Sequence, residues 1–192
     1  MSVQTKQTVR YPIFHGTDYD IAKQIESVGF IVRKNEHHWL GNGIYFFKDC
    51  NLAIWWAKAQ HREFGSTVKT PAVINAQLIV DRSRVLDLRD LADLKQFMDW
   101  KVELDSMISN DHEIDIQAYR CALFDGIFDK KDKDVIIGCF DSEGKKYISD
   151  ILGLGDALDQ LKLIFGEVQF CVKESKQKEL IADIDIEDVS SY

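Results

Sequence analysis

Three short segments of this sequence carry residue types that could hold a small molecule and act on it. His15 ends a short apolar run, Tyr45 lies within the run WLGNGIYFF, and a tryptophan pair follows at Trp55 and Trp56. An imidazole can donate or accept a hydrogen bond, and aromatic faces attract cations by about 0.5–2 kcal/mol. Each feature alone is more often structural, so it is their joint order and spacing that favours a binding site.

The strands and helices that must position these residues have clear sequence signals. A strand is expected over residues 11–14, directly before His15, and Asp18 is a suitable N-cap for a helix that ends at Gly29. Other segments with a strand pattern are 43–47, 72–80, 135–140 and 168–172, and those with a helix pattern are 52–64, 91–108, 117–128 and 157–164. Because helices interrupt the strands without strict alternation, the pattern indicates an α+β fold rather than a doubly wound parallel sheet.

The order of these segments resembles the PARP-like, or diphtheria-toxin-like, ADP-ribosyltransferases, which are known by an H-Y-E signature. The match spans His15 to Ala57 and consists of His-Gly-Thr, the run from Trp39 to Phe47 and the following helix. A weaker match to an uncharacterised group of bacterial ADP-ribosyltransferase-like proteins covers DVIIGCFDSEG, residues 134–144, and VQFCVKES. The resemblance implies an α+β fold with a split β-sheet flanked by helices and a cleft for NAD between its halves.

What the resemblance implies for NAD binding can be stated for each matching residue. In the family, the His of the first strand hydrogen-bonds a ribose hydroxyl of NAD, and the Gly after it pairs through its backbone with the nicotinamide carboxamide. These positions are His15 and Gly16 here, and Thr17 belongs to the same expected set. The Tyr of the GIYF strand, here Tyr45, stacks on the nicotinamide ring.

In PARP-like members a second aromatic residue lies on the other side of the nicotinamide, and Trp56 stands at that position here. It would be presented by a helix that Asn51 can cap. Because a helix turns by about 100° per residue, we expect Trp56 to face the ligand and Trp55 to pack in the core. Gly43, together with Gly41, would let the backbone approach the ligand closely.

The third position of the signature is a Glu that begins the last core strand, and Gln169 occupies it in this sequence, as in the bacterial group. In the family this Glu hydrogen-bonds the nicotinamide ribose and stabilises the oxocarbenium ion. A Gln can hold the hydroxyl but brings no negative charge, and loss of one preorganised electrostatic contact costs about 10²–10³ in rate. Residues two apart on a strand point the same way, about 6.6–6.8 Å apart, so Glu167 would share the cleft with Gln169.

We therefore expect Gln169 to orient the ribose, while Glu167 either stabilises the developing cation or deprotonates the acceptor. The alternative is that Glu167 merely ends a loop at the surface. The whole reaction implied by the resemblance is mono-ADP-ribosylation, in which ADP-ribose moves from NAD to a macromolecular acceptor, protein or nucleic acid, with release of nicotinamide. Such an enzyme needs no metal, because the nicotinamide leaving group is activated by its own positive charge.

Other functions and settings also fit the resemblance. The family includes bacterial toxins and phage-defence effectors, so a toxin with a neutralising partner protein is one setting, by analogy. An NAD glycohydrolase, with water as the acceptor, is one alternative to the transferase. A catalytically inactive NAD-binding or interaction module is another, and Gln169 favours it.

Length and composition limit the architectures and partners. With 192 residues the chain is expected to form one domain over residues 9–178, followed by an acidic C-terminal tail, residues 179–192. The net charge of −8 argues against bulk electrostatic binding of nucleic acid but leaves room for a locally basic cleft. The four cysteines include no CxxC pair and are expected to be reduced. Without a secretory signal or an apolar run of roughly 20 residues, a cytoplasmic protein with no membrane partner is expected.

The loop of residues 33–39, which would border the NAD site, carries further polar side chains. His37 and His38 lack partners at metal-ligand spacing, so a contact with the NAD phosphates or with solvent is favoured over a metal site. Arg33 and Lys34 could pair with the pyrophosphate.

Overall fold

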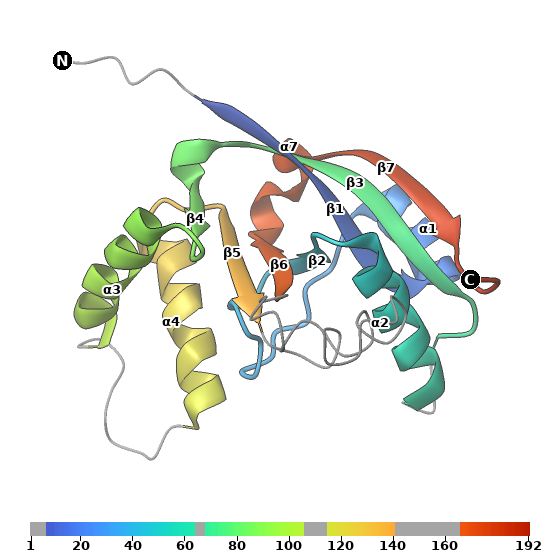
Figure 1. Cartoon of the computed structure of the whole chain (residues 1–192), viewed down its shortest axis with the longest axis horizontal. Helices are drawn as coiled ribbons and strands as arrows, with labels where there is room; N and C mark the ends of the chain where they lie inside the picture. The colour runs from blue at the N-terminus through green and yellow to red at the C-terminus, as the bar shows by residue number, and fades with distance from the viewer. Residues whose placement is uncertain (1–6, 64–67, 106–114, 141–165) are drawn as a thin grey trace, which may run out of the picture.

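The computed structural model describes residues 7–63, 68–105, 115–140 and 166–192, and the fold is given for these ranges. Seven strands within them form one sheet in the order β4-β5-β6-β2-β1-β3-β7 (Figure 1). The strands are β1 (Thr8–Asp18), β2 (Ile44–Phe47), β3 (Pro71–Asp81), β4 (Val85–Asp87), β5 (Val135–Phe140), β6 (Glu167–Val172) and β7 (Ile181–Asp188). The helices are α1 (Tyr19–Val28), α2 (Cys50–Glu63), α3 (Leu91–Asp105), α4 (Ile116–Lys130) and α7 (Gln177–Leu180). Of the strand pairs in these ranges only β4–β5 is parallel, so the mainly antiparallel sheet agrees with the expected α+β class.

The two faces of the sheet are covered by different helices. Alternate residues of a strand point to opposite faces, and Phe46 packs with the cluster around α1 whereas Phe47 packs with α2. In β5, Ile137 likewise joins the α1 side, and Ile136 joins the cluster of α4. Helices α2 and α4 therefore cover the same face, and Figure 1 shows them toward opposite ends of the sheet. The strands between these two helices, β2 and β6, carry the candidate site.

The sheet is divided between β1 and β2. These two strands share one Cα pair, Phe14 with Phe47, whereas β1 pairs with β3 along its whole length. Beyond Phe14 the strands separate, so His15, Gly16 and Thr17 have a strand partner on the β3 side alone. The sheet is therefore open at the end of β1 that carries the His-Gly-Thr motif.

Local capping explains where the first two helices begin. Asp18 caps α1, as expected, because its Oδ1 accepts a hydrogen bond from the N–H of Asp20 at 2.9 Å. The expected cap of α2 is shifted by two residues. Asn51 does not cap this helix, since its own N–H donates to Asp49 Oδ1 at 2.8 Å, which makes Asp49 the capping residue.

The C-terminal residues do not form the solvated tail that their acidity suggested. They form β7, which pairs antiparallel with β3 at an edge of the sheet, so β6 is not the last strand. Ile184 and Ile186 pack against the core on the α1 side, while Asp183 and Asp185 are exposed. Alternation of packed and exposed residues is the ordinary pattern of a strand, but the many acidic residues of this segment made the pattern hard to recognise in the sequence.

The other expected strands and helices are present, with ends that differ by a few residues. The helix expected over residues 157–164 lies outside the described residues, and the one expected over 91–108 is described as α3, as far as Asp105. None of the described helices is both long enough and apolar enough to cross a bilayer.

Candidate functional site

A cavity of about 510 Å³ lies where β1 and β2 separate, and we call it the β1–β2 cavity. Residues of β1, β2, α2, β6 and the loop before β2 line it: His15, His37, His38, Trp39, Tyr45, Phe46, Phe47, Trp55, Trp56, Glu167 and Gln169. The segments that carry the His, the Tyr and the tryptophans of the sequence motif therefore meet at one place, together with the acidic and amide side chains of β6.

His15 joins the two separated strands through its side chain. Its Nδ1 donates a hydrogen bond to the main-chain carbonyl of Tyr45 at 2.8 Å, because a carbonyl oxygen can only accept. Burial of the ring lowers the pKa of His15 below its ordinary value, and the bond to Tyr45 only partly offsets this. Near neutral pH the ring is therefore uncharged, and Nε2 can accept a hydrogen bond from a ligand hydroxyl. The rings of Phe30 and Phe46 pack edge-on against the imidazole, with centroids 5.2 and 5.8 Å away, and fix its orientation.

Tyr45 reaches the cavity from β2 with a hydroxyl that is already occupied. The hydroxyl donates to the carbonyl of Gly41 at 2.8 Å and accepts from the N–H of Leu40 at 2.7 Å. Burial raises the pKa of Tyr45 above its ordinary value, so the phenol stays protonated. Because the hydroxyl holds the preceding turn, the ring is the part of Tyr45 that can bind a ligand.

Both tryptophans of α2 line the cavity, so the expectation that Trp55 packs in the core away from it is wrong. Their ring centroids lie 6.0 Å apart, with 48° between the planes. Trp56 is 37% exposed and Trp55 is half-buried. Successive helical residues leave the helix in directions about 100° apart. The indole side chains are long enough for both to reach the same cavity.

Glu167 and Gln169 meet the cavity from the same side of β6. Gln169 Nε2 donates a hydrogen bond to Glu167 Oε1. Glu167 is 3% exposed, so the alternative that it ends a surface loop is wrong. A carboxylate removed from water beside aromatic walls favours positive charge near it and is placed to accept a proton. The pair thus brings to the cavity an acidic side chain that Gln169 alone does not provide.

The remaining motif residues, Gly16, Thr17 and Gly43, are not among the described residues that line the cavity. A Cβ on Gly16 would lie 2.1 Å from the carbonyl oxygen of Ala53, so glycine here lets α2 cross β1 closely. A Cβ on Gly43 would lie 2.5 Å from Cys171 Sγ, so glycine there lets the loop approach β6. Thr17 is buried within β1. Gly16 and Gly43 therefore let the backbone come close to neighbouring elements of the protein, α2 and β6, and not to the described lining of the cavity.

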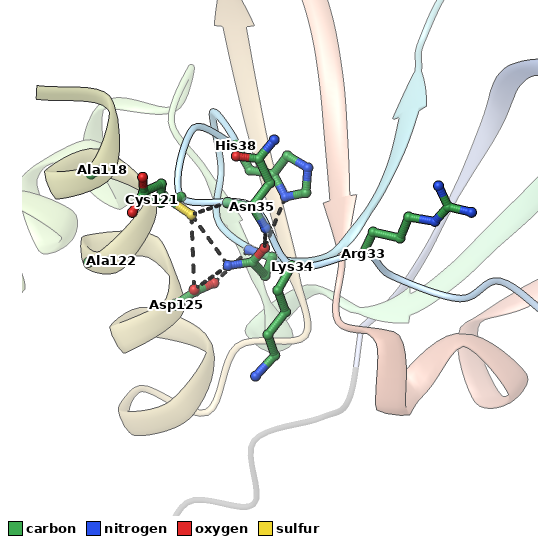
Figure 2. A pocket seen from close by; sticks show the side chains of 10 residues that line it. Arg33, Lys34, Asn35, His38, Ala118, Cys121, Ala122 and Asp125 are labelled. Atoms are coloured by element: carbon green, nitrogen blue, oxygen red, sulfur yellow. Dashed lines mark hydrogen bonds between the residues drawn. The ribbon is translucent and has the colours of Figure 1, made fainter. Parts of the chain in front are cut away.

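Asn42 and Asp125, which sequence patterns did not single out, fasten the loop before β2 to α4. Figure 2 shows Asp125 on α4, with Asn35 of the loop nearby. Asp125 accepts hydrogen bonds from the main-chain N–H of Asn42 at 2.6 Å and from its side-chain amide at 2.7 Å. Asn42 Oδ1 in turn accepts from the N–H of Asn35 at 2.8 Å and from His38 Nδ1 at 3.0 Å. Gly41 completes the turn with φ +83°, a conformation that favours glycine.

Between this loop and α4 lies a second cavity, of about 800 Å³, which we call the α4 cavity. Figure 2 shows Arg33, Lys34, Asp125 and Cys121 around it. Arg33 and Lys34 line the α4 cavity, whereas His38 lines both cavities. Across the described ranges, no three His, Cys, Asp or Glu side chains gather in a group that could hold a metal ion.

Comparison with known proteins finds a partial relative. No protein-family model matches the sequence. An uncharacterised protein of Methanocaldococcus jannaschii is 36% identical to this chain over 78 residues, which make up 40% of this chain and 36% of the archaeal protein. The chain thus covers well under two thirds of this relative, which itself has no described activity.

Proposed function

We propose that this protein is an NAD-dependent mono-ADP-ribosyltransferase with the split-sheet fold of that family. One observation supports this most directly: His15, Tyr45, Trp56 and the Glu167–Gln169 pair line a single cavity at a break in the sheet. The family resemblance assigns His15, Tyr45, Trp56 and Gln169 to the nicotinamide end of NAD, and the spacing on β6 adds Glu167. These residues come from four separate elements. A structural role for each alone would not require them to share one cavity.

The cavity suits a pyridinium ring attached to a ribose. Its volume of about 510 Å³ lies within the range of small-molecule sites, about 300–1,000 Å³. The aromatic rings of Tyr45, Trp55 and Trp56 favour a flat cationic ring. His15 Nε2 would accept a ribose hydroxyl, and Gln169 would hold the ribose next to the nicotinamide.

The proposed transfer breaks the bond between ribose C1′ and the nicotinamide nitrogen, and nicotinamide leaves with the electron pair as a neutral molecule. A nucleophilic atom of the acceptor forms the new bond to C1′ and loses its proton. Glu167 is placed to stabilise positive charge on the ribose or to accept that proton. Gln169 keeps the carboxylate of Glu167 in position through its amide, as their hydrogen bond indicates.

The acceptor in this proposal is a macromolecule, protein or nucleic acid, and the setting is a cytoplasmic toxin or defence effector with a neutralising partner protein. If water takes the place of the acceptor, the same site is an NAD glycohydrolase. If Gln169 prevents turnover, the same site is an NAD-binding module. Measurement of label transfer together with nicotinamide release separates these three outcomes.

The binding half of the proposal is tested by titrating NAD against the intrinsic tryptophan fluorescence of the pure protein. Trp56→Leu is expected to weaken NAD binding by about 2- to 30-fold, because it removes a contact of about 0.5–2 kcal/mol. Trp100→Leu is the matched control, since Trp100 is a half-buried tryptophan of α3 outside the described lining of the cavity. For the variant His15→Ala the control is His61→Ala, because the His61 ring also contacts a main-chain carbonyl, that of Val68, outside the described lining of the cavity.

The catalytic half is tested by incubating the protein with NAD labelled in its adenylate phosphate and with fractionated lysate. Glu167→Gln is expected to lower label transfer by about 10²–10³ while leaving NAD affinity within a few fold. Nicotinamide release without transfer would make the protein a glycohydrolase, and binding without turnover would make it an inactive module. No NAD binding by the wild-type protein would overturn the proposal.

A further inference from the structure

A third cavity, of about 520 Å³, lies next to the β1–β2 cavity, and we call it the Arg120 cavity. Its walls come from α4, β5, the loop before β2 and the turn after β4. Trp39 lines both this cavity and the β1–β2 cavity, so the two meet at its indole. The ring of Phe140 packs on Trp39 with a centroid separation of 4.6 Å and lines the Arg120 cavity.

The register of β5 and β6 brings the Arg120 cavity next to the polar pair of the candidate site. Phe140 is the Cα partner of Glu167, and Gly138 is the Cα partner of Gln169. Both β5 residues line the Arg120 cavity, and both β6 residues line the β1–β2 cavity. Cα partners in antiparallel strands lie about 4.5–5.5 Å apart. A molecule in the Arg120 cavity would therefore be one strand away from the residues that serve the reacting ribose.

Arg120 gives this cavity a positive charge that the proposed NAD site does not use. Its guanidinium carbon lies 5.6 Å from the centre of the Trp39 ring. Its Nε is buried and has no hydrogen-bond acceptor in the part of the chain that the structure describes. Buried polar groups are nearly always paired, so an unpaired donor beside a cavity points to a ligand. A second guanidinium, that of Arg89, is held by Asp87 through hydrogen bonds of 2.8 and 2.7 Å.

We propose that the Arg120 cavity binds the acceptor of the transfer and that Arg120 holds a phosphate group of this acceptor. The inference rests on the proposed function, because it assigns the second substrate of the same reaction. An arginine fork binds an oxyanion through two parallel hydrogen bonds. Asp87 neutralises the Arg89 guanidinium, so Arg120 supplies the uncompensated positive charge of the cavity. With no carboxylate among the described lining residues, this charge favours a phosphate over the less charged carboxylate. The aromatic wall of Trp39 and Phe140 suits a nucleobase.

The acceptor class is therefore a nucleotide, either free or within a nucleic acid strand, and not an acidic protein. This is compatible with the overall charge of −8, because the local positive charge of Arg120 can bind a phosphate where the surface as a whole cannot. The nucleophilic atom of the bound nucleotide attacks C1′ from the β5 side, and its proton passes to Glu167. No further reactant is required.

Phosphate binding is tested without NAD, by titrating inorganic phosphate into ¹⁵N-labelled protein and following the arginine Nε–H resonances. The Arg120 resonance, assigned by its loss in Arg120→Lys, is expected to shift in a saturable way. The resonance of Arg62, an exposed arginine of α2, is the internal control and is expected to stay in place. Absence of any shift at Arg120 would overturn the inference whatever the protein does with NAD.

The acceptor role is tested by transfer from labelled NAD to a pool of single-stranded oligonucleotides, to free nucleotides and to a pool of acidic peptides. Arg120→Gln is expected to lower transfer to nucleotides by about tenfold or more while NAD affinity, read from fluorescence, stays as in the wild type. Arg120→Lys, which keeps the charge, is expected to recover part of the transfer. Arg62→Gln is the matched control.

The outcomes separate this inference from the proposed function. Transfer to oligonucleotides but not to free nucleotides identifies a nucleic acid acceptor, and the reverse identifies a small-molecule acceptor. Transfer to peptides alone, or equal transfer by Arg120→Gln and wild type, would overturn the inference while leaving the transferase intact. Absence of NAD binding would instead overturn the proposed function and the acceptor role with it, even if phosphate still shifts the Nε–H resonance of Arg120.

Discussion

The loop before β2 borders two cavities whose linings differ in chemistry, a polar one on the α4 side and a largely aromatic one on the β1–β2 side. On the α4 side, Asp125, Asn42 and Asn35 satisfy one another through a chain of hydrogen bonds. On the β1–β2 side, Nδ1 is the His15 ring nitrogen with a hydrogen bond among the described residues, and the rings of Tyr45 and Trp56 line the cavity. The larger cavity lies on the α4 side, about 800 Å³ against about 510 Å³. Unused bonding capacity, rather than cavity size, is therefore what favours the β1–β2 cavity as the candidate site.

The tyrosine of the motif belongs to both sides. The hydroxyl of Tyr45 is consumed by Leu40 and Gly41, which continue into the turn that Asp125 fastens, while its ring faces the β1–β2 cavity. Asp125 is therefore expected to act on the candidate site through this turn, as a positioning residue. If the two sides of the loop have these separate roles, variants on the α4 side should change stability, and variants on the β1–β2 side should change ligand binding.

The largest effect is expected for Asp125→Ala. The change removes the acceptor of two hydrogen bonds from Asn42, and hydrogen bonds to charged groups are worth about 1.5–3 kcal/mol each. We expect the free energy of unfolding, measured by urea denaturation, to fall by about 2–4 kcal/mol.

Asp129→Ala is the control for this variant, because Asp129 is an exposed carboxylate on the same helix. It is expected to change stability by less than about 0.5 kcal/mol. Equal losses for Asp125→Ala and Asp129→Ala would mean that the loop is not fastened by this pair, and the comparison of the two sides would fail.

The parts of the fold that follow from local chemistry could be predicted from the sequence. Asp18 caps α1 as its place before an apolar helix pattern indicates, and the alternation in β3 matches its burial. In β7 the isoleucines also alternate with acidic residues, but Asp183 and Asp185 obscured this pattern, and the pairing with β3 shifts register near Asp183. The order of the His, Tyr and Trp segments was enough to indicate which elements meet.

What could not be predicted depends on contacts between residues far apart in the chain. Asp125 and Asn42 are 83 residues apart, and no local pattern of either marks the pair. The reach of Trp55 into the cavity depends on the rotamer of a long side chain, which helical spacing does not determine. The unpaired Nε of Arg120 is likewise visible only once α4 is packed on β5.

A smaller effect, and a sharper test of the two sides, is expected for Tyr45→Phe. This change removes the two hydroxyl hydrogen bonds and keeps the ring, so the free energy of unfolding should fall by about 1–2 kcal/mol. NAD affinity, measured by fluorescence titration, should stay within about threefold of the wild type. Tyr45→Leu, which also removes the ring, should weaken NAD binding by a further factor of about 2 to 30. If Tyr45→Phe weakens binding as much as Tyr45→Leu, then the hydroxyl, and not the ring, serves the ligand.

The smallest effect is the dependence of stability on the charge of His15. Burial holds its folded-state pKa below the ordinary value of 6.5, so the folded protein binds fewer protons than the unfolded chain at mildly acidic pH. The contribution is absent well above pH 6.5, and stability is lost as the pH falls from that value through the lowered pKa. We therefore expect the free energy of unfolding to fall less in His15→Gln than in the wild type between about pH 8 and about pH 5.5. An NMR titration of the His15 ring measures its pKa directly. A pKa above the ordinary value would show that the ring lies beside a negative charge. The buried, uncharged ring that accepts a ligand hydroxyl would then be wrong.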